Sequence, residues 1–293
     1  MALAVLMFTS IAGTEQDRKV RVDDPIGPQL LKWSDGVYSI GKHNALNSRL
    51  VHPLFRRALE RSDPGAYGFM TARLVHMDDV VRQEAAAGLD QLVILGAGYD
   101  TRAYRMQDDL VDVRVFEVDV PAMSEDKRSR LEGALGSVPG DVEYLEVDFT
   151  HDHLFERLNG HGYDESARTL FVLCGVSMYL PEKTILELFS QVAAHSADGS
   201  SIVFDYVFDD MLTAPERHPG AAKWIERARA AGEELRFGVS PDRIGEILSG
   251  GGLNFASQAD MPELAERYLR RGDGTMMAEP YGFAAVARAV VGA

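Results

Sequence analysis

Short apolar runs alternate with amphipathic segments along the chain after residue 90. Five of these runs predict buried strands because they are brief, apolar and bounded by glycine or polar residues. They cover 92–95, 113–119, 142–148, 169–175 and 201–208. The amphipathic segments between the runs predict helices. This alternation of strands and helices predicts an open, mostly parallel sheet with helices on both faces. Two later runs, 253–259 and 281–290, complete a seven-stranded α/β sheet of the Rossmann-like class.

The first 88 residues lack the alternation of a strand. Apolar residues recur at helical spacing within 50–59, and 67–87 predicts a longer helix. Helices ahead of the first strand commonly cover a ligand crevice. We therefore expect a helical cover or lid over 1–88 and a catalytic domain over 89–293. A polar helical insertion at about 209–238 interrupts the alternation of strands and helices in that domain.

A glycine turn follows the first predicted strand. Its sequence, Gly96-Ala97-Gly98, lets a ligand approach the backbone closely. Glu117 and Asp119 end the next strand about 20 residues further on, a spacing that suits a carboxylate on ribose hydroxyls. Thr101 occupies the place of the third glycine of a dinucleotide motif. The pattern therefore disfavours a nicotinamide oxidoreductase and favours an adenosyl ligand without phosphates, S-adenosylmethionine.

Candidate ligand contacts also end the next two strands. Asp148 and Phe149 end the third, and the segment 174–179 follows the fourth. Each acid alone fits a helix cap or an ion pair equally well. However, an unpaired buried carboxylate is costly, and one ligand accounts for the acids together. Asp119 would then bind the ribose diol, while Asp148 accepts from the adenine amino group and Phe149 packs on the ring.

Composition excludes several classes of partner. The chain of 293 residues has 30 basic and 45 acidic residues and a net charge of −15, which disfavours nucleic acid. It has one cysteine, consistent with the cytoplasm, and no apolar run of about 20 residues that predicts a membrane span. The apolar start, 1–8, is expected to dock on the fold rather than to act as a signal. A small-molecule substrate remains, and the oligomeric state stays open.

Several motifs carry a resemblance to a known family. LVILGAGYDTRAYR begins at Leu92, VFEVDVPA at Val115 and GVSMYLPEKT at Gly175. In order and spacing they resemble the leucine carboxyl methyltransferase family of class I S-adenosylmethionine-dependent methyltransferases. The closer likeness is to bacterial O-methyltransferases of polyketide pathways, such as the tetracenomycin type. The resemblance covers roughly 67–290.

The resemblance implies a set of cofactor contacts. Arg73 would bind the methionyl carboxylate, Asp119 the ribose, and Asp148 with Phe149 the adenine. The cofactor-binding set as a whole is Arg73, Gly96, Ala97, Gly98, Asp100, Glu117, Asp119, Asp148, Phe149 and Cys174. Cys174 departs from the family, which usually has glutamate there to hold the methionyl ammonium. It is expected to be a small buried residue or part of an altered amino-acid subsite, and not a nucleophile.

The function expected from the sequence is O-methylation of a small-molecule carboxylate, or of a hydroxyl, in secondary metabolism. The helical cover and the insertion would form the acceptor pocket, with Tyr179 and Tyr206 as candidate contacts. Cys174 motivates an alternative, an enzyme that cyclises or cleaves the aminobutyryl chain of S-adenosylmethionine without methyl transfer. A non-catalytic binding module is a further alternative.

The acceptor decides whether a catalytic base is needed. A carboxylate is ionised at neutral pH and needs none, whereas a hydroxyl needs a base within hydrogen-bond reach. The candidate bases are His43, His52, His76 and His218. The pair His151 and His153 lacks a third ligand nearby in the sequence, so no metal site is predicted.

Overall fold

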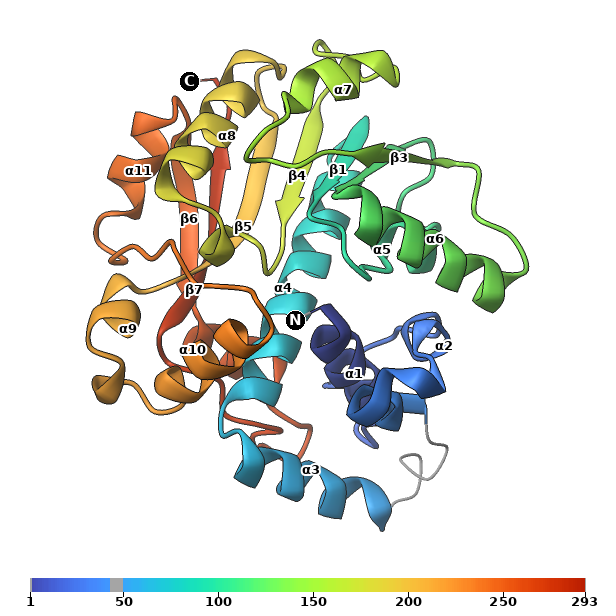
Figure 1. Cartoon of the computed structure of the whole chain (residues 1–293), viewed down its shortest axis with the longest axis vertical. Coiled ribbons are helices and arrows are strands. Elements are labelled where there is room, and N and C mark those ends of the chain that lie inside the picture. The colour runs from blue at the N-terminus through green and yellow to red at the C-terminus, as the bar shows by residue number, and fades with distance from the viewer. Residues whose placement is uncertain (1, 43–49, 293) are drawn as a thin grey trace.

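The computed structural model describes residues 2–42 and 50–292, and a seven-stranded sheet forms its centre (Figure 1). The strands are β1 (Gln91–Leu95), β2 (Arg114–Asp119), β3 (Val142–Glu146), β4 (Thr169–Leu173), β5 (Ser201–Val207), β6 (Asn254–Asp260) and β7 (Ala284–Val290). Their order is β3-β2-β1-β4-β5-β7-β6, and β7 pairs antiparallel with both β5 and β6 while the other pairs are parallel. The fold class predicted from the sequence is confirmed.

The direction in which strands are added reverses at β1. This strand pairs in parallel with β2 on one side and with β4 on the other. Leu95, its last residue, is level with the last residue of β4 and the penultimate residue of β2. The chain therefore leaves three neighbouring strands at nearly the same level. At such a switch point the connections diverge, and a ligand crevice forms beyond the carboxyl ends.

Helices cover both faces of the sheet. One layer holds α7 (Leu154–Gly160), α8 (Glu182–Ala194) and α11 (Ile244–Gly250), which pack in a core cluster with Val93 and Leu95. The other holds α1 (Ala2–Ala12), α4 (Ala66–Ala86), α6 (Pro121–Leu135) and α12 (Met261–Tyr268), which pack with Leu92 and Ile94. Successive residues of a strand face opposite sides, so one apolar run contributes to both cores.

Helix α4 brings a charged side chain into the centre of the molecule. It packs against β4 and β5, and every residue from Ala66 to Leu74 is buried, Arg73 included. This end of α4 is therefore part of the core. Whether residues 1–88 act as a separate cover stays a prediction.

The N-terminal segment lies near the carboxyl edge of the sheet (Figure 1). The apolar start forms α1, which packs on α4, on α2 (Gly27–Leu30) and on the 3₁₀ segment η1 (Trp33–Lys42). Helix α3 (Val51–Ser62) leads into α4. Short elements complete the fold: α5 (Arg102–Arg105), η3 (Ser177–Tyr179), α9 (Asp209–Thr213), η4 (Pro215–Arg217) and α10 (Ala221–Ala230). The last three fall within 209–238, where the sequence predicts a helical insertion.

Candidate functional site

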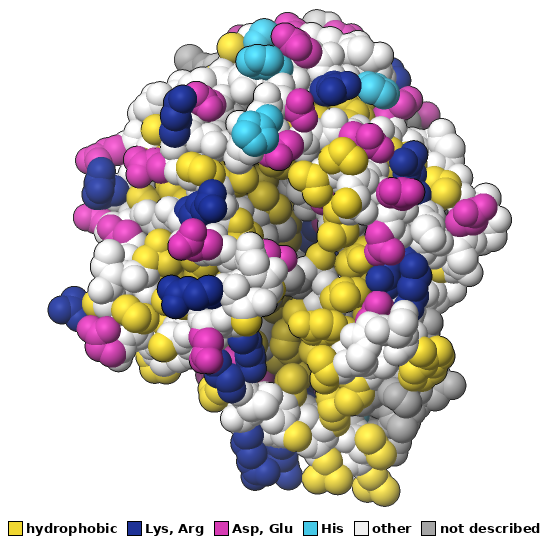
Figure 2. Space-filling model, viewed as in Figure 1, with side chains coloured by type: hydrophobic (Ala, Val, Ile, Leu, Met, Phe, Trp, Pro, Cys, Tyr) yellow, Lys and Arg dark blue, Asp and Glu magenta, His cyan; other side chains and the backbone are white. Residues whose placement is uncertain are grey.

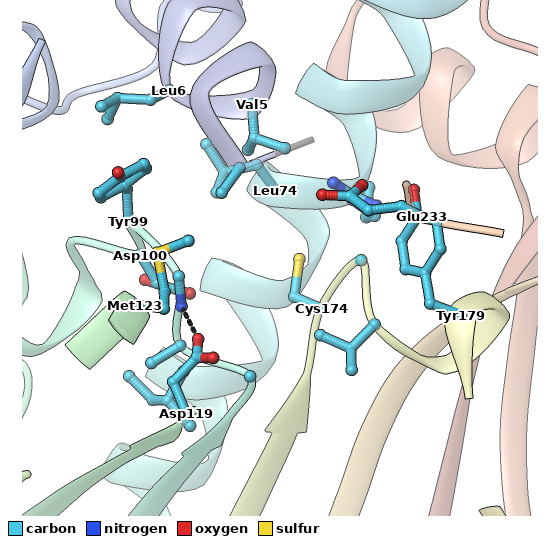
Figure 3. Close-up of a pocket in the computed structure, with 18 of the residues that line it drawn as sticks. Val5, Leu6, Leu74, Tyr99, Asp100, Asp119, Met123, Cys174, Tyr179 and Glu233 are labelled. Carbon is cyan, nitrogen blue, oxygen red and sulfur yellow. Dashed lines mark hydrogen bonds between the residues drawn. The ribbon is translucent and has the colours of Figure 1, made fainter. Parts of the chain in front are cut away.

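A cavity of about 430 Å³ lies beyond the carboxyl ends of β1, β2 and β4. Its size suits a small organic ligand. It lies near the middle of the face in Figure 2, where mostly apolar side chains surround a hollow. Side chains from α1, α4 and α6 and from the segment after α10 close it (Figure 3). We call this the first cavity.

The glycine turn forms the floor of the first cavity. Gly96 has a φ of 65°, and a Cβ added there would lie 2.4 Å from Val176 Cγ2. Any side chain at this position would therefore be strained and would fill space beside the cavity. Gly98, with a φ of 43°, and Ala97 also line it. The close approach of a ligand to this backbone stays a prediction.

Asp119 is fixed at the edge of this turn. Its Oδ2 accepts a hydrogen bond of 2.6 Å from the Gly98 N–H, and its Oδ1 accepts one of 2.7 Å from the Val120 N–H (Figure 3). Burial raises the pKa of Asp119, while the two N–H donors act to lower it. The carboxylate lines the cavity and keeps lone pairs for a ligand hydroxyl.

Asp148 and Phe149 lie side by side in the lining, beyond the end of β3. The Asp148 Oδ1 accepts hydrogen bonds from the Thr150 hydroxyl at 2.6 Å and from the Thr150 N–H at 2.9 Å. These bonds lower the pKa of Asp148, so the carboxyl is ionised at neutral pH. The structure therefore brings together an acceptor and an aromatic face, both predicted for adenine.

Arg73 lines the first cavity although its side chain is only 2% exposed. Its Nη1 forms an ion pair of 2.6 Å with Asp205 Oδ2. Burial acts to lower the pKa of Arg73, but neighbouring groups, Asp205 foremost, together raise the pKa above its usual range. The Arg73 Nε makes no hydrogen bond with any residue that the structure describes. A buried cation with a spare donor suits a ligand carboxylate.

Asp205 is a site residue that sequence reasoning missed. It is fully buried in β5, and its Oδ1 also accepts a hydrogen bond of 2.6 Å from the Gly175 N–H. The acid thus links Arg73 to the turn after β4. The sequence did contain a signal for Asp205, because an aspartate inside an otherwise apolar strand requires a buried polar partner.

Cys174 lines the cavity at the end of β4 as a free thiol. Burial raises its pKa, and the nearby Arg73 charge only partly opposes that effect. The side chain is therefore a neutral thiol at neutral pH. It cannot supply the negative charge that an ammonium group requires, and it is not an activated nucleophile.

Asp100 and Tyr179 also line the first cavity. The carboxylate of Asp100 forms an ion pair with Arg102 and accepts a hydrogen bond of 2.8 Å from the Arg102 N–H. Burial, and secondly the charge of Glu233, raise the pKa of Tyr179. Glu233 and Trp224 belong to the lining as well. Both reach the site from the 209–238 insertion, to which the sequence assigned the acceptor pocket but no individual contact.

Two predicted contacts, Glu117 and Tyr206, do not line the first cavity. Glu117 sits two residues inside β2, beneath α6, and forms a buried ion pair of 2.7 Å with Lys127. Tyr206 donates a hydrogen bond of 2.9 Å to Gln258 Oε1. Its neighbour Asp205 faces Arg73, so strand alternation turns Tyr206 toward the opposite core layer.

A second cavity of about 540 Å³ adjoins the first. Met70 and Trp224 line both, so these two side chains stand between them. The other lining residues are mainly apolar or aromatic and come from α1, η1, the α3–α4 region, α10 and the segment before β7: Ala4, Met7, Phe8, Val37, Tyr38, Leu59, Ser62, Asp63, Ala66, Arg227, Ala230, Ala231 and Tyr281. A ligand here would contact mainly apolar and aromatic side chains, with Asp63 and Arg227 as the charged groups of the lining.

The candidate histidine bases do not line these cavities where the structure describes them. His52 is buried, with its Nε2 3.9 Å from Glu15 Oε1. His76 Nδ1 lies 3.2 Å from the Tyr268 hydroxyl, and burial lowers the His76 pKa to about 4. His218 pairs with Asp210 at 2.8 Å. His43 lies outside the described residues.

Residues 2–42 and 50–292 lack both a metal-binding cluster and a membrane-spanning helix. No group of three or more histidine, cysteine, aspartate or glutamate residues there is placed to hold a metal ion. No helix in those ranges has the length and apolarity needed to cross a bilayer.

The family model for leucine carboxyl methyltransferase matches residues 3–193. The chain belongs to this family. The match starts well before residue 67, so it includes the N-terminal helices that carry no recognisable motif. It ends before the 209–238 insertion. The family resemblance predicted from the motifs is confirmed, while the likeness to the polyketide branch stays a prediction.

Relatives carry names of the same kind. YktD of Bacillus subtilis, provisionally named an S-adenosyl-L-methionine-dependent methyltransferase, is 33% identical over 182 residues, which are 62% of this chain and 60% of that protein. A relative with the same provisional name from Mycobacterium sp. (strain KMS) is 33% identical over 254 residues, 80% of this chain and 72% of the relative. The chain thus spans less than two thirds of the Bacillus relative.

Solved structures share the fold at low sequence identity. A DUF574 family protein from Streptomyces avermitilis has a TM-score of 0.57 and 17% identity, covering 83% of this chain and 91% of that chain. A protein from Thermobifida fusca, provisionally named a methyltransferase, has a TM-score of 0.58 and 16% identity, covering 84% and 90%. At such identities the likeness supports the methyltransferase fold and nothing narrower.

Proposed function

We propose that the protein is an S-adenosylmethionine-dependent O-methyltransferase that acts on a small-molecule carboxylate or hydroxyl in secondary metabolism. The observation that carries the proposal is a single cavity at the switch point of the sheet, lined by Asp119 on one side and by Arg73 on another. Family membership and the provisional names of the relatives support it.

The residues of the first cavity fit this cofactor. Asp119 offers an anchored carboxylate to the ribose diol, and Asp148 with Phe149 offers an acceptor and a ring face to adenine. Arg73 offers its guanidinium group, in the cavity lining, to the methionyl carboxylate. Gly96 keeps the turn at the cavity floor free of a side chain, since a Cβ there would collide with Val176. The donors and acceptors thus match an adenosyl group joined to an amino acid.

Bound cofactor would supply an electrophilic methyl group on its sulfonium. The task of the protein is then to hold the acceptor in line with that methyl and to exclude water. Val5 and Leu6 of α1 place apolar side chains over the first cavity (Figure 3). Met70 and Trp224 bound it toward the second cavity.

We place the acceptor in the second cavity, enclosed by the 1–88 cover and the 209–238 insertion. Its aromatic and apolar lining favours an acceptor with a flat or apolar body. Among the described lining residues of the two cavities there is no histidine that could take a proton from a hydroxyl. A carboxylate, with a pKa of roughly 4, needs no such base and is the favoured acceptor.

Methyl transfer can be tested with cofactor that carries a labelled methyl group. The protein is incubated with matched aromatic and aliphatic compounds that bear either a carboxylate or a hydroxyl. Label should pass to an acceptor and yield S-adenosylhomocysteine in equal amount. Mild alkali releases labelled methanol from an ester but not from an ether, which identifies the acceptor group. Failure to bind either form of the cofactor in calorimetry would refute the proposal.

The neutral thiol of Cys174 favours one second candidate, an enzyme that uses S-adenosylmethionine without transferring its methyl group. An altered amino-acid subsite could direct attack within the aminobutyryl chain. Incubation with cofactor alone separates the two functions. Methylthioadenosine formed without an acceptor, faster than in a protein-free control, would support this candidate and contradict methyl transfer.

A further inference from the structure

Glu233 reaches the first cavity from a segment that comes just after α10. Its backbone N–H donates a hydrogen bond of 2.8 Å to the Ala228 carbonyl, which fixes the turn that ends α10. A little further on, the N–H groups of Arg236 and Phe237 donate to the Met178 carbonyl at 2.7 and 3.2 Å. The segment is thus tied to η3, the turn that follows β4.

The side chain of Glu233 extends over the cavity from the side opposite the glycine turn (Figure 3). Tyr179 lies beside it, and the Cys174 thiol points toward the same space from below (Figure 3). The charge of Glu233 acts on Tyr179, as does that of Arg73. Arg73, Cys174, Tyr179 and Glu233 therefore surround one end of the cavity.

The other carboxylates in the described lining lie nearer the glycine turn or follow β2 and β3 (Figure 3). Asp100 pairs with Arg102, and Asp24 accepts a hydrogen bond of 2.8 Å from the Thr101 hydroxyl. Asp119 and Asp148 follow β2 and β3, on the side of the switch point away from β4. Glu233 instead lies beside Tyr179, on the side of the cavity opposite the glycine turn (Figure 3).

An amino-acid group presents a carboxylate and an ammonium together. Arg73 gives that end of the cavity a cation, while Cys174, at the tip of β4, gives no anion. A zwitterion held by Arg73 alone would leave its ammonium without a charged acceptor in a partly dry site, which is unfavourable. A second, negative group is required at the same end.

We propose that Glu233 binds the ammonium of the aminobutyryl chain of the cofactor, in place of a carboxylate at position 174. This inference rests on the proposed cofactor but not on the identity of the acceptor. The insertion thereby becomes part of the cofactor site. Trp224, on the same insertion, lines both cavities, so the contact also positions a wall of the acceptor cavity.

Calorimetric titration with two ligands tests the proposal without an acceptor. S-Adenosylhomocysteine contains the amino-acid group, whereas 5′-methylthioadenosine retains the adenosyl part and lacks it. Glu233→Gln should weaken binding of S-adenosylhomocysteine by about tenfold or more, since a hydrogen bond between two charged groups is lost. Binding of methylthioadenosine should stay within about twofold of wild type. Glu233→Asp keeps the negative charge, so it should weaken binding of S-adenosylhomocysteine less than Glu233→Gln does.

Glu234→Gln is the matched control, because its exposed side chain adjoins Glu233 in sequence but does not line the cavity. It should bind both ligands as wild type does. Equal affinity of wild type and Glu233→Gln for S-adenosylhomocysteine would overturn the inference. So would an equal loss for both ligands, which indicates a change of shape. If wild type bound neither ligand, the proposed cofactor itself would fail.

Discussion

The backbone N–H of Gly98 donates a 2.6 Å hydrogen bond to Asp119 Oδ2, joining the turn after β1 to the end of β2. Val120 donates to the other oxygen of the same carboxylate at 2.7 Å. Two main-chain donors thus fix the acid in the position that a ribose diol requires. Because the contact is preorganised, a ligand does not have to order this side chain when it binds.

Asp119→Asn tests the ribose contact. The change keeps the size of the side chain and removes its charge and one acceptor oxygen. Losing charged hydrogen bonds costs about 1.5–3 kcal/mol, or about 10- to 100-fold in Kd. S-Adenosylhomocysteine and methylthioadenosine both contain the ribose, so calorimetry should show the loss for both.

Asp112→Asn is a suitable control for this variant, because Asp112 is exposed just before β2 and its φ of 64° is tolerated by asparagine. It should leave both affinities unchanged. Wild-type affinity of Asp119→Asn for methylthioadenosine would place the ribose elsewhere.

The sequence predicted those parts of the site that lie at strand ends. Gly96 and Asp119 could be located because glycine and acidic residues interrupt apolar runs, and the ends of parallel strands converge. Glu117 was misplaced because spacing along the chain does not distinguish a residue at the tip of a strand from one two positions inside it. The α6 side chain that covers it, Lys127, becomes apparent only once the helix is packed.

Other parts of the site could not be predicted because tertiary packing decides them. The direction of Tyr206 depends on which face of β5 meets α4, and one residue of offset reverses it. Glu233 carries no motif, and its place depends on the turn after α10. Helix α12 was also missed, although Asp260 and Glu263 form the capping box that marks its start.

Lys127→Met should destabilise the fold. The side chains of Lys127 and Glu117 are each 2% exposed, so removing the lysine leaves the Glu117 carboxylate buried without a positive partner. Breaking such a pair costs about 3–5 kcal/mol. Urea denaturation should show this loss at pH 7, whereas Lys183→Met, on an exposed lysine of α8, should show almost none. A normal unfolding free energy would contradict a structural role for the pair.

The stability of Lys127→Met should also depend on pH in a defined direction. Burial already raises the pKa of Glu117 despite the Lys127 charge, and removing that charge raises it further. The folded state then holds a proton that the unfolded chain, with a glutamate pKa of about 4.3, releases. The unfolding free energy should therefore increase as the pH is lowered from about 8 to about 5. If the unfolding free energy of Lys127→Met did not increase relative to that of wild type as the pH is lowered, this account would be contradicted.

Filling the second cavity should block the acceptor and leave the cofactor unaffected. Ala230, near the end of α10, lines the second cavity and not the first. Ala230→Phe should lower kcat/KM for the best acceptor by about tenfold or more, because a displaced acceptor loses its alignment. The Kd for S-adenosylhomocysteine should stay the same.

Ala222→Phe provides the comparison, since Ala222 is exposed on the same helix and lines neither cavity. Unchanged kcat/KM in Ala230→Phe would show that acceptors bind elsewhere. A parallel loss in Ala222→Phe would instead point to a general disturbance of α10.

A glutamate introduced at position 174 should restore what Glu233→Gln loses. The end of β4 is held by strand pairing and by the bond from Gly175 to Asp205, so a longer side chain there would extend into the cavity rather than move the backbone. Arg73 is already paired with Asp205 and leaves the new carboxylate available to an ammonium.

The doubly substituted Cys174→Glu, Glu233→Gln protein should therefore bind S-adenosylhomocysteine within about threefold of wild type, since one charged acceptor replaces another. Cys174→Gln in the same background adds nearly the same volume without the charge and should restore nothing. Calorimetry on the two proteins separates charge from shape. If both remained equally weak while methylthioadenosine still bound, position 174 would not face the ammonium, and Glu233 could not be its replacement.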